Sequence, residues 1–198
     1  MAPRNTGRLV GVLFLAAFLL YGGGSALSDR PLGLGLMLLN SVAVATIGAA
    51  TFRVLRAAIP RTAWSYLVVR ALEAALLAVG TLFLASGSHA GNDLAYGAAM
   101  LTLGAGSIPF CLMLAAQHRV PRWFGGWGAI GYALLAVGSV LEFAVPGSGV
   151  LLAAPGGLFE VALGLLLIRR GFPDPAARRL PGTPDLSPSR PQEDPVRG

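Results

Sequence analysis

Three charged residues lie deep inside long apolar stretches of this sequence, where ionised side chains are rare. Arg70 and Glu73 are three positions apart in one stretch, so a helix would place them on one face. Glu160 lies in a stretch near the end of the sequence. Counted from the nearest polar boundary at about 1.5 Å per helical residue, all three lie roughly 9–13 Å deep. We expect them to meet in the interior of a helix bundle.

Two interpretations of this cluster stay open. A charge at the centre of a bilayer costs about 2.5–3.5 kcal/mol on the insertion scale, so such residues turn inward and find partners. One interpretation is a polar site for an ion, a proton or a small substrate. The other is a structural ion pair, Arg70 with Glu160 or Glu73, that fixes how two helices pack.

Two further polar residues are secondary candidates. Asn40 lies in the middle of the second apolar stretch, where its amide could serve a site or join two helices. Glu142 lies near the end of the fifth stretch, about 22 Å along a helix from Trp127, which places it close to a membrane interface.

Motifs for catalysis and metal binding are missing. There is no His-Glu-x-x-His sequence, and Cys111 is the single cysteine. Pro146-Gly147-Ser148-Gly149 resembles an intramembrane serine protease motif but lacks its first glycine, and no histidine lies within a span to act as the base. The sequence therefore predicts no catalytic residues, no metal site and no cofactor, and it disfavours an enzyme.

Composition requires lipid as the main solvent. Of 198 residues, 55% are hydrophobic and 12% are charged, whereas soluble domains are about 25% charged. The net charge of +6 does not indicate a nucleic-acid partner, because the arginines sit at the edges of apolar runs and in the C-terminal segment. The expected partner is the lipid bilayer, with anionic lipid at the cytoplasmic arginines.

Six apolar stretches are each long enough to cross the hydrocarbon core as a helix. The predicted fold is therefore an all-α, polytopic membrane helix bundle formed by residues 1–172. The predicted spans are 9–27, 32–52, 63–86, 95–116, 124–145 and 149–168. Residues 173–198 are rich in proline and arginine and are expected to form a disordered tail.

The arginines also predict the orientation. Thirteen of the 15 fall on one side of a six-span arrangement, so the positive-inside rule places both termini in the cytoplasm. An interfacial aromatic belt is expected at the cytoplasmic ends of spans three and five, formed by Trp64, Tyr66, Trp123 and Trp127. A cleavable signal peptide is the alternative for the first stretch, but its apolar run is longer than a usual signal core.

Several short motifs together resemble a known family. They are Gly7-Arg8, Arg70-x-x-Glu73-Ala74, Arg119-Val120-Pro121-Arg122-Trp123-Phe124-Gly125, Gly131-Tyr132, Glu160 and Arg170-Gly171-Phe172. Over about residues 7–172 the sequence resembles the bacterial membrane family of domain of unknown function 4386. The resemblance implies a multi-pass protein of the bacterial cytoplasmic (inner) membrane and implies no particular activity.

Two function classes follow from these features. The first is a small-solute or ion transporter or permeation protein, which needs Arg70, Glu73 and Glu160 to border a hydrated cavity. The alternative is a membrane-embedded sensor or assembly partner without transport activity, which would use the tail and the cytoplasmic arginines.

Overall fold

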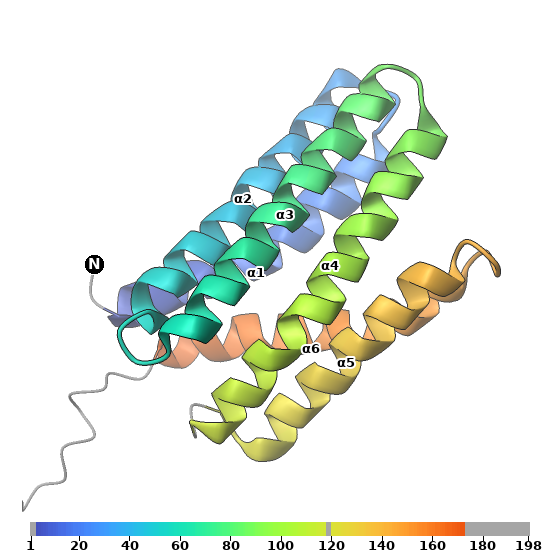
Figure 1. Cartoon of the computed structure of the whole chain (residues 1–198). Helices are drawn as coiled ribbons and strands as arrows, with labels where there is room; N and C mark the ends of the chain where they lie inside the picture. Colours follow the sequence, from blue (N-terminus) through green and yellow to red (C-terminus); the bar gives the residue numbers. More distant parts are fainter. Residues whose placement is uncertain (1–2, 118–119, 173–198) are drawn as a thin grey trace, which may run out of the picture.

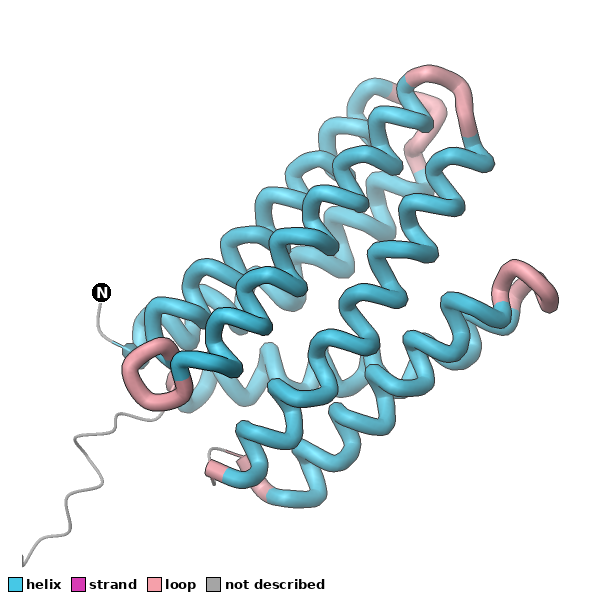
Figure 2. Tube along the Cα trace, viewed as in Figure 1, coloured by secondary structure: helices cyan, strands magenta, loops and turns pink. Residues whose placement is uncertain are grey.

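Six α-helices make up the described part of the chain. The computed structural model describes residues 3–117 and 120–172, and no strand occurs within them (Figure 1, Figure 2). The predicted tail at 173–198 lies outside the described residues. Each helix is long and apolar enough to cross a membrane, so the predicted all-α, multi-pass membrane fold is confirmed. The helices are α1 (Pro3–Ala26), α2 (Pro31–Leu55), α3 (Pro60–Ala85), α4 (His89–Ala116), α5 (Arg122–Leu141) and α6 (Ser148–Arg170).

Local sequence signals decide where the helices begin. Pro31 and Pro60 open α2 and α3, in the first turn, where a missing backbone N–H costs nothing. The fourth helix begins at His89 rather than at the expected Ala95. The cause is Ser88, whose hydroxyl accepts a hydrogen bond from the backbone N–H of Gly91 at 3.2 Å and caps the helix.

The fifth helix ends at Leu141, although the apolar stretch continues to Val145. Val145 precedes Pro146, and the residue before a proline is disfavoured in helical conformation. Glu142 is thereby placed in the α5–α6 turn and not inside a span. Gly147 in the same turn has φ of 88°, a left-handed conformation that glycine adopts readily.

The helices form a closed ring in chain order. Each helix packs against its neighbours in sequence, and α1 also packs against α6. Across the ring no two helix backbones come into close contact within the described residues, and only side chains meet. Both described ends lie at one end of the bundle (Figure 1). We call this end the terminal face and the other end the opposite face. The α1–α2, α3–α4 and α5–α6 connections lie at the opposite face, where α5 and α6 lean away from α1–α3 (Figure 1).

Glycines allow the close approaches that seal this ring. A Cβ added at Gly11 of α1 would collide with the backbone of Gly164 in α6. A Cβ at Gly131 of α5 would lie 2.8 Å from the Cα of Gly156 in α6. Small residues of this kind let membrane helices pack backbone to backbone, which compensates for the lack of a hydrophobic driving force between helices in lipid.

Polarity is inverted relative to a soluble protein. Leu19, Val150 and Leu151 are more than three-quarters exposed, whereas Arg70 is 2% exposed. Extensive apolar surface of this kind marks contact with a membrane. The ring therefore presents leucine and valine to lipid and keeps Arg70, Glu73 and the largely buried Glu160 inside.

Candidate functional site

Arg70 is the centre of a buried hydrogen-bond network. All three nitrogens of its guanidinium donate: Nε to the hydroxyl of Tyr66 at 2.9 Å, Nη1 to Oε2 of Glu73 at 3.0 Å, and Nη2 to Oε1 of Glu160 at 2.9 Å. The side chains of Arg70 and Glu73 are 2% and 4% exposed, and that of Glu160 is 14% exposed. We call Arg70, Glu73 and Glu160 the charge cluster. The three residues that the sequence analysis placed at one depth in the membrane are therefore in contact through Arg70.

A second tyrosine extends the network to a third helix. Tyr132 of α5 donates its hydroxyl proton to Oε1 of Glu160 at 2.7 Å, so one carboxylate oxygen accepts bonds from both α3 and α5. The ring of Phe14 from α1 lies under the guanidinium, with its centroid 5.1 Å from Cζ of Arg70, which is a cation–π distance. The cluster thus ties together helices that are not neighbours in the ring.

A glycine on α2 makes room for the arginine stem. A Cβ at Gly48 would lie 2.7 Å from Cβ of Arg70, closer than side-chain atoms approach. Gly48 therefore allows α2 and α3 to pack closely at the level where Arg70 enters the interior. The same helix carries Gly35, which has nothing within 4 Å of such a Cβ.

The charges of the cluster do not balance. One guanidinium pairs with two carboxylates, so the fully ionised cluster has one positive and two negative charges, a net charge of −1. An unbalanced charge inside a membrane protein is costly and calls for a proton or a bound cation as compensation. Among the described residues, no group of three or more histidine, cysteine, aspartate or glutamate side chains could hold a metal ion.

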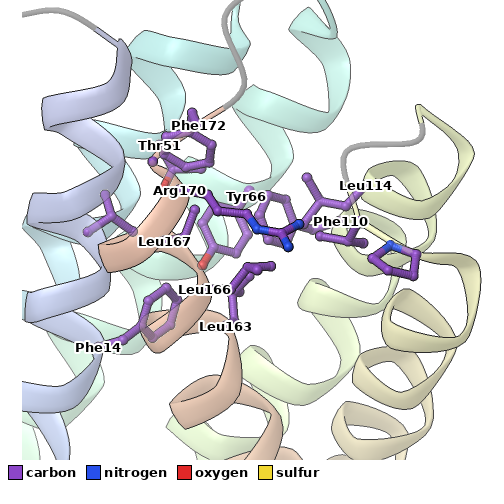
Figure 3. A pocket seen from close by; sticks show the side chains of 14 residues that line it. Phe14, Thr51, Tyr66, Phe110, Leu114, Leu163, Leu166, Leu167, Arg170 and Phe172 are labelled. Carbon is purple, nitrogen blue, oxygen red and sulfur yellow. The ribbon is translucent and has the colours of Figure 1, made fainter.

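A cavity of about 120 Å³ lies between the cluster and the terminal face (Figure 3). We call it the terminal cavity. Figure 3 shows the rings of Phe14, Tyr66 and Phe110, from three different helices, among its lining side chains. At its mouth, Gly171 has φ of 68° and turns the chain so that Phe172 is buried, 5% exposed, beside the exposed Arg170. The described residues that line this cavity include no carboxylate.

A larger cavity of about 230 Å³ lies on the other side of the cluster. We call it the central cavity. All three charged residues of the cluster line it, together with Asn40, Tyr21 and Tyr96. Tyr21 and Tyr96 stack with ring centroids 5.2 Å apart. Apolar side chains from α1, α2, α3 and α4 form the rest of its wall.

Asn40 brings an unsatisfied group to the central cavity. The residue is 3% exposed, and its Oδ1 is buried without a hydrogen-bond partner. A buried acceptor left unpaired costs about 1–3 kcal/mol. Such a cost in a native structure needs an explanation, and a bound donor is one.

A third cavity, of about 440 Å³, continues toward the opposite face. We call it the vestibule. It shares Tyr96 and Met100 with the central cavity and carries two carboxylates, those of Asp93 and Glu142. Glu142 accepts hydrogen bonds from the backbone N–H groups of Gly147 at 2.7 Å and Gly149 at 2.6 Å. These two bonds lower the pKa of Glu142 below its ordinary value.

The sequence missed the tyrosines of the network. Tyr66 was expected in an interfacial belt, but it is 1% exposed and bonded to Arg70, whereas Trp64 and Trp123 are 57% and 69% exposed. The available signal was its spacing, since Tyr66 lies four residues before Arg70 and therefore on the same helix face. Tyr132 belongs to the Gly131-Tyr132 motif, to which the sequence analysis assigned no role. Its position in the sequence gives no indication that it contacts Glu160.

Comparison with known proteins identifies one family. Residues 87–171 match the sequence profile of the family described as domain of unknown function (DUF4386). This stretch covers α4, α5 and α6, and it includes Tyr132 and Glu160 of the network. No curated protein and no solved structure matches the chain significantly. The chain is a multi-pass membrane protein whose residues 87–171 match the DUF4386 family, the family that its sequence resembles.

Proposed function

We propose that this chain is a small-solute or ion transporter of the bacterial cytoplasmic membrane, and that the charge cluster is the barrier along its path. One observation carries the proposal: the network stands between two cavities. Tyr66 lines the terminal cavity. Arg70, which donates a hydrogen bond to Tyr66, lines the central cavity together with both carboxylates of the cluster. Phe14 lines both cavities.

The ring architecture supports this path. Because helix backbones across the ring are not in contact within the described residues, side chains fill the interior, and these can change rotamer without the separation of packed helices. Ionisable residues within membrane spans mark substrate and ion pathways in many transporters. Transporter sites also lie near the membrane midplane, where access alternates between the two faces.

The arginine distribution gives the path its direction. The terminal face carries the arginine-rich connections and would face the cytoplasm under the positive-inside rule. The vestibule and the central cavity would then open to the outside. In this arrangement the cluster is open to the central cavity and the vestibule, and Tyr66 and Phe14 close it toward the cytoplasm.

The test is solute flux into liposomes that contain the purified protein. Light scattering after an osmotic step follows the entry of acetate, guanidinium or glycerol, with valinomycin and potassium to compensate charge. We expect one of these classes to enter faster than in protein-free liposomes. Glu160→Gln should reduce that flux at least tenfold and still fold, because Glu73 remains as an ionised partner for Arg70.

The matched control is Asp29→Asn, which makes the same chemical change at an exposed position in the α1–α2 turn and should leave flux unchanged. If no class of solute crosses faster than in protein-free liposomes, the transport proposal fails. A sensor or assembly partner then becomes the better account of the same ion pair.

A further inference from the structure

Three side-chain oxygens at the central cavity, from the two carboxylates and Asn40, are acceptors without a hydrogen-bond partner among the described residues. The network occupies Oε2 of Glu73 and Oε1 of Glu160, so Oε1 of Glu73 and Oε2 of Glu160 have no hydrogen-bond partner in the described part of the chain. Oδ1 of Asn40 is the third free acceptor, and it is buried. An organic ligand that satisfies these oxygens must bring N–H or O–H donors, whereas a metal cation would coordinate them directly.

The charge at this cavity favours a cation. The cluster contributes one positive and two negative charges, and the adjoining vestibule adds Asp93 and Glu142. Among the described residues, no arginine lines the vestibule, and Arg70 is the one arginine at the central cavity, where its three nitrogens already donate to partners. Clefts lined by one sign of charge raise the local concentration of the opposite ion.

The walls of the cavity favour an organic cation over a bare metal ion. Hard metal cations take a shell of oxygen ligands, and most of the lining here is apolar or aromatic. The rings of Phe14, Tyr21 and Tyr96 can face an apolar body and stabilise positive charge through their π-systems. A volume of about 230 Å³ is small for a ligand site, which limits the ligand to about one ring in size.

We propose that the central cavity binds a small organic cation that carries N–H donors, of the ammonium or guanidinium class. Its donors would bond to Asn40, Glu73 and Glu160, and its apolar body would lie among the aromatic rings. Binding depends only on the cavity. The statement that this cation is the transported solute rests on the transport function proposed above.

The test uses three probes of similar shape with the full-length protein in detergent. Benzylguanidinium has both charge and N–H donors, benzylurea has donors without charge, and benzyltrimethylammonium has charge without donors. Isothermal titration should show binding of benzylguanidinium at least tenfold tighter than of either other probe, after subtraction of a titration into empty micelles. Equal affinity for all three probes, or no binding of benzylguanidinium, would overturn the proposal.

Asn40→Leu identifies the site. Leucine has a similar size, and it removes a buried acceptor without a partner, so the variant should fold and melt no lower than the native protein. Its affinity for benzylguanidinium should fall at least tenfold, while Asp29→Asn should bind like the native protein. Unchanged affinity in Asn40→Leu would place the cation elsewhere and refute the assignment.

The outcomes separate this inference from the transport proposal. Binding of benzylguanidinium without flux of any solute leaves the cation site standing and removes transport. Flux of acetate or glycerol, with no guanidinium flux and no benzylguanidinium binding, keeps transport and removes the cation site.

Discussion

The two sides of the charge cluster offer different chemistry. Toward the terminal face, Arg70 meets the hydroxyl of Tyr66 and a cavity with aromatic and aliphatic walls, with Phe172 at its mouth. Toward the opposite face, Glu73 and Glu160 border a larger cavity that leads into an acidic vestibule. The carboxylates of the network therefore face the central cavity and not the terminal cavity. Such a one-sided arrangement fits the transport function proposed above, with the carboxylates reached from a single face.

The largest expected effect comes from removing both carboxylates of the cluster. Glu73→Gln with Glu160→Gln leaves Arg70 buried without an ionised partner, and arginine cannot lose its proton. We expect a loss of about 3–5 kcal/mol in stability. Arg70→Met should cost less, because carboxylates left behind can take up protons. Melting temperatures in detergent at mildly acid pH measure both.

Adding Arg70→Met to the double carboxylate variant should recover much of that loss. If the effects of the separate changes simply add, the three residues are not coupled. The cluster would then consist of independently solvated charges, and the comparison between its two sides would lose its basis.

Gly48→Ala tests what holds Arg70 at the boundary between the cavities. The new methyl group would press on Cβ of Arg70 and shift α3 against α2. We expect a loss of about 1–3 kcal/mol, typical of overpacking. Gly35→Ala on the same helix is the matched control, since nothing lies near its Cβ. Equal melting temperatures for the two variants would show that Gly48 does not position Arg70.

The two tyrosines should differ in their effect on stability. Tyr66→Phe leaves the Nε–H of Arg70 buried without an acceptor, at a cost of about 1–3 kcal/mol. Tyr132→Phe leaves Oε1 of Glu160 still bonded to Arg70, so its cost should be smaller, about 1 kcal/mol. Thermal unfolding of the two variants side by side measures the difference. A larger loss in Tyr132→Phe would contradict the central place of Arg70.

The smallest effect concerns the rim of the vestibule. Glu142 has a lowered pKa because Gly147 and Gly149 donate to it, so its charged form stabilises the α5–α6 turn. This contribution is present above the unfolded pKa, about 4.3 for glutamate, and is lost as the pH falls through the folded pKa. Glu142→Gln should therefore melt below the native protein at pH 7, and the gap should close below about pH 4. A gap that is constant with pH would show that the charge is not involved.

The sequence predicted the helices and part of the site for identifiable reasons. Span length follows from membrane thickness, and the cost of buried charge brings Arg70, Glu73 and Glu160 inward wherever their helices lie. Tyr66, Tyr132 and the cavity around Asn40 could not be predicted in the same way. They depend on which helices are neighbours and on which face of each helix turns inward. Uniformly apolar helices carry little periodicity that would reveal either.

Glu142 shows a different limit. Its apolar surroundings extend to Val145, so hydropathy alone places it inside a span. The helix ends earlier because the Pro146-Gly147 turn follows and because the Glu142 carboxylate accepts from the N–H of Gly147 in that turn and from the N–H of Gly149 at the start of α6. The end of α5 is therefore set by the residues of the turn and not by the length of the apolar stretch.

The most direct test of the central claim is access to the two cavities from the two faces of the membrane. Cys111, the single native cysteine, is replaced by alanine, and one cysteine is introduced at Met100 of the central cavity or at Leu166 of the terminal cavity. A membrane-impermeant thiol reagent is applied to right-side-out and to inverted vesicles. The account predicts that Met100→Cys reacts only from the opposite face and that Leu166→Cys reacts only from the terminal face. Reaction of both cysteines from the same face would contradict a barrier at Arg70, Glu73 and Glu160.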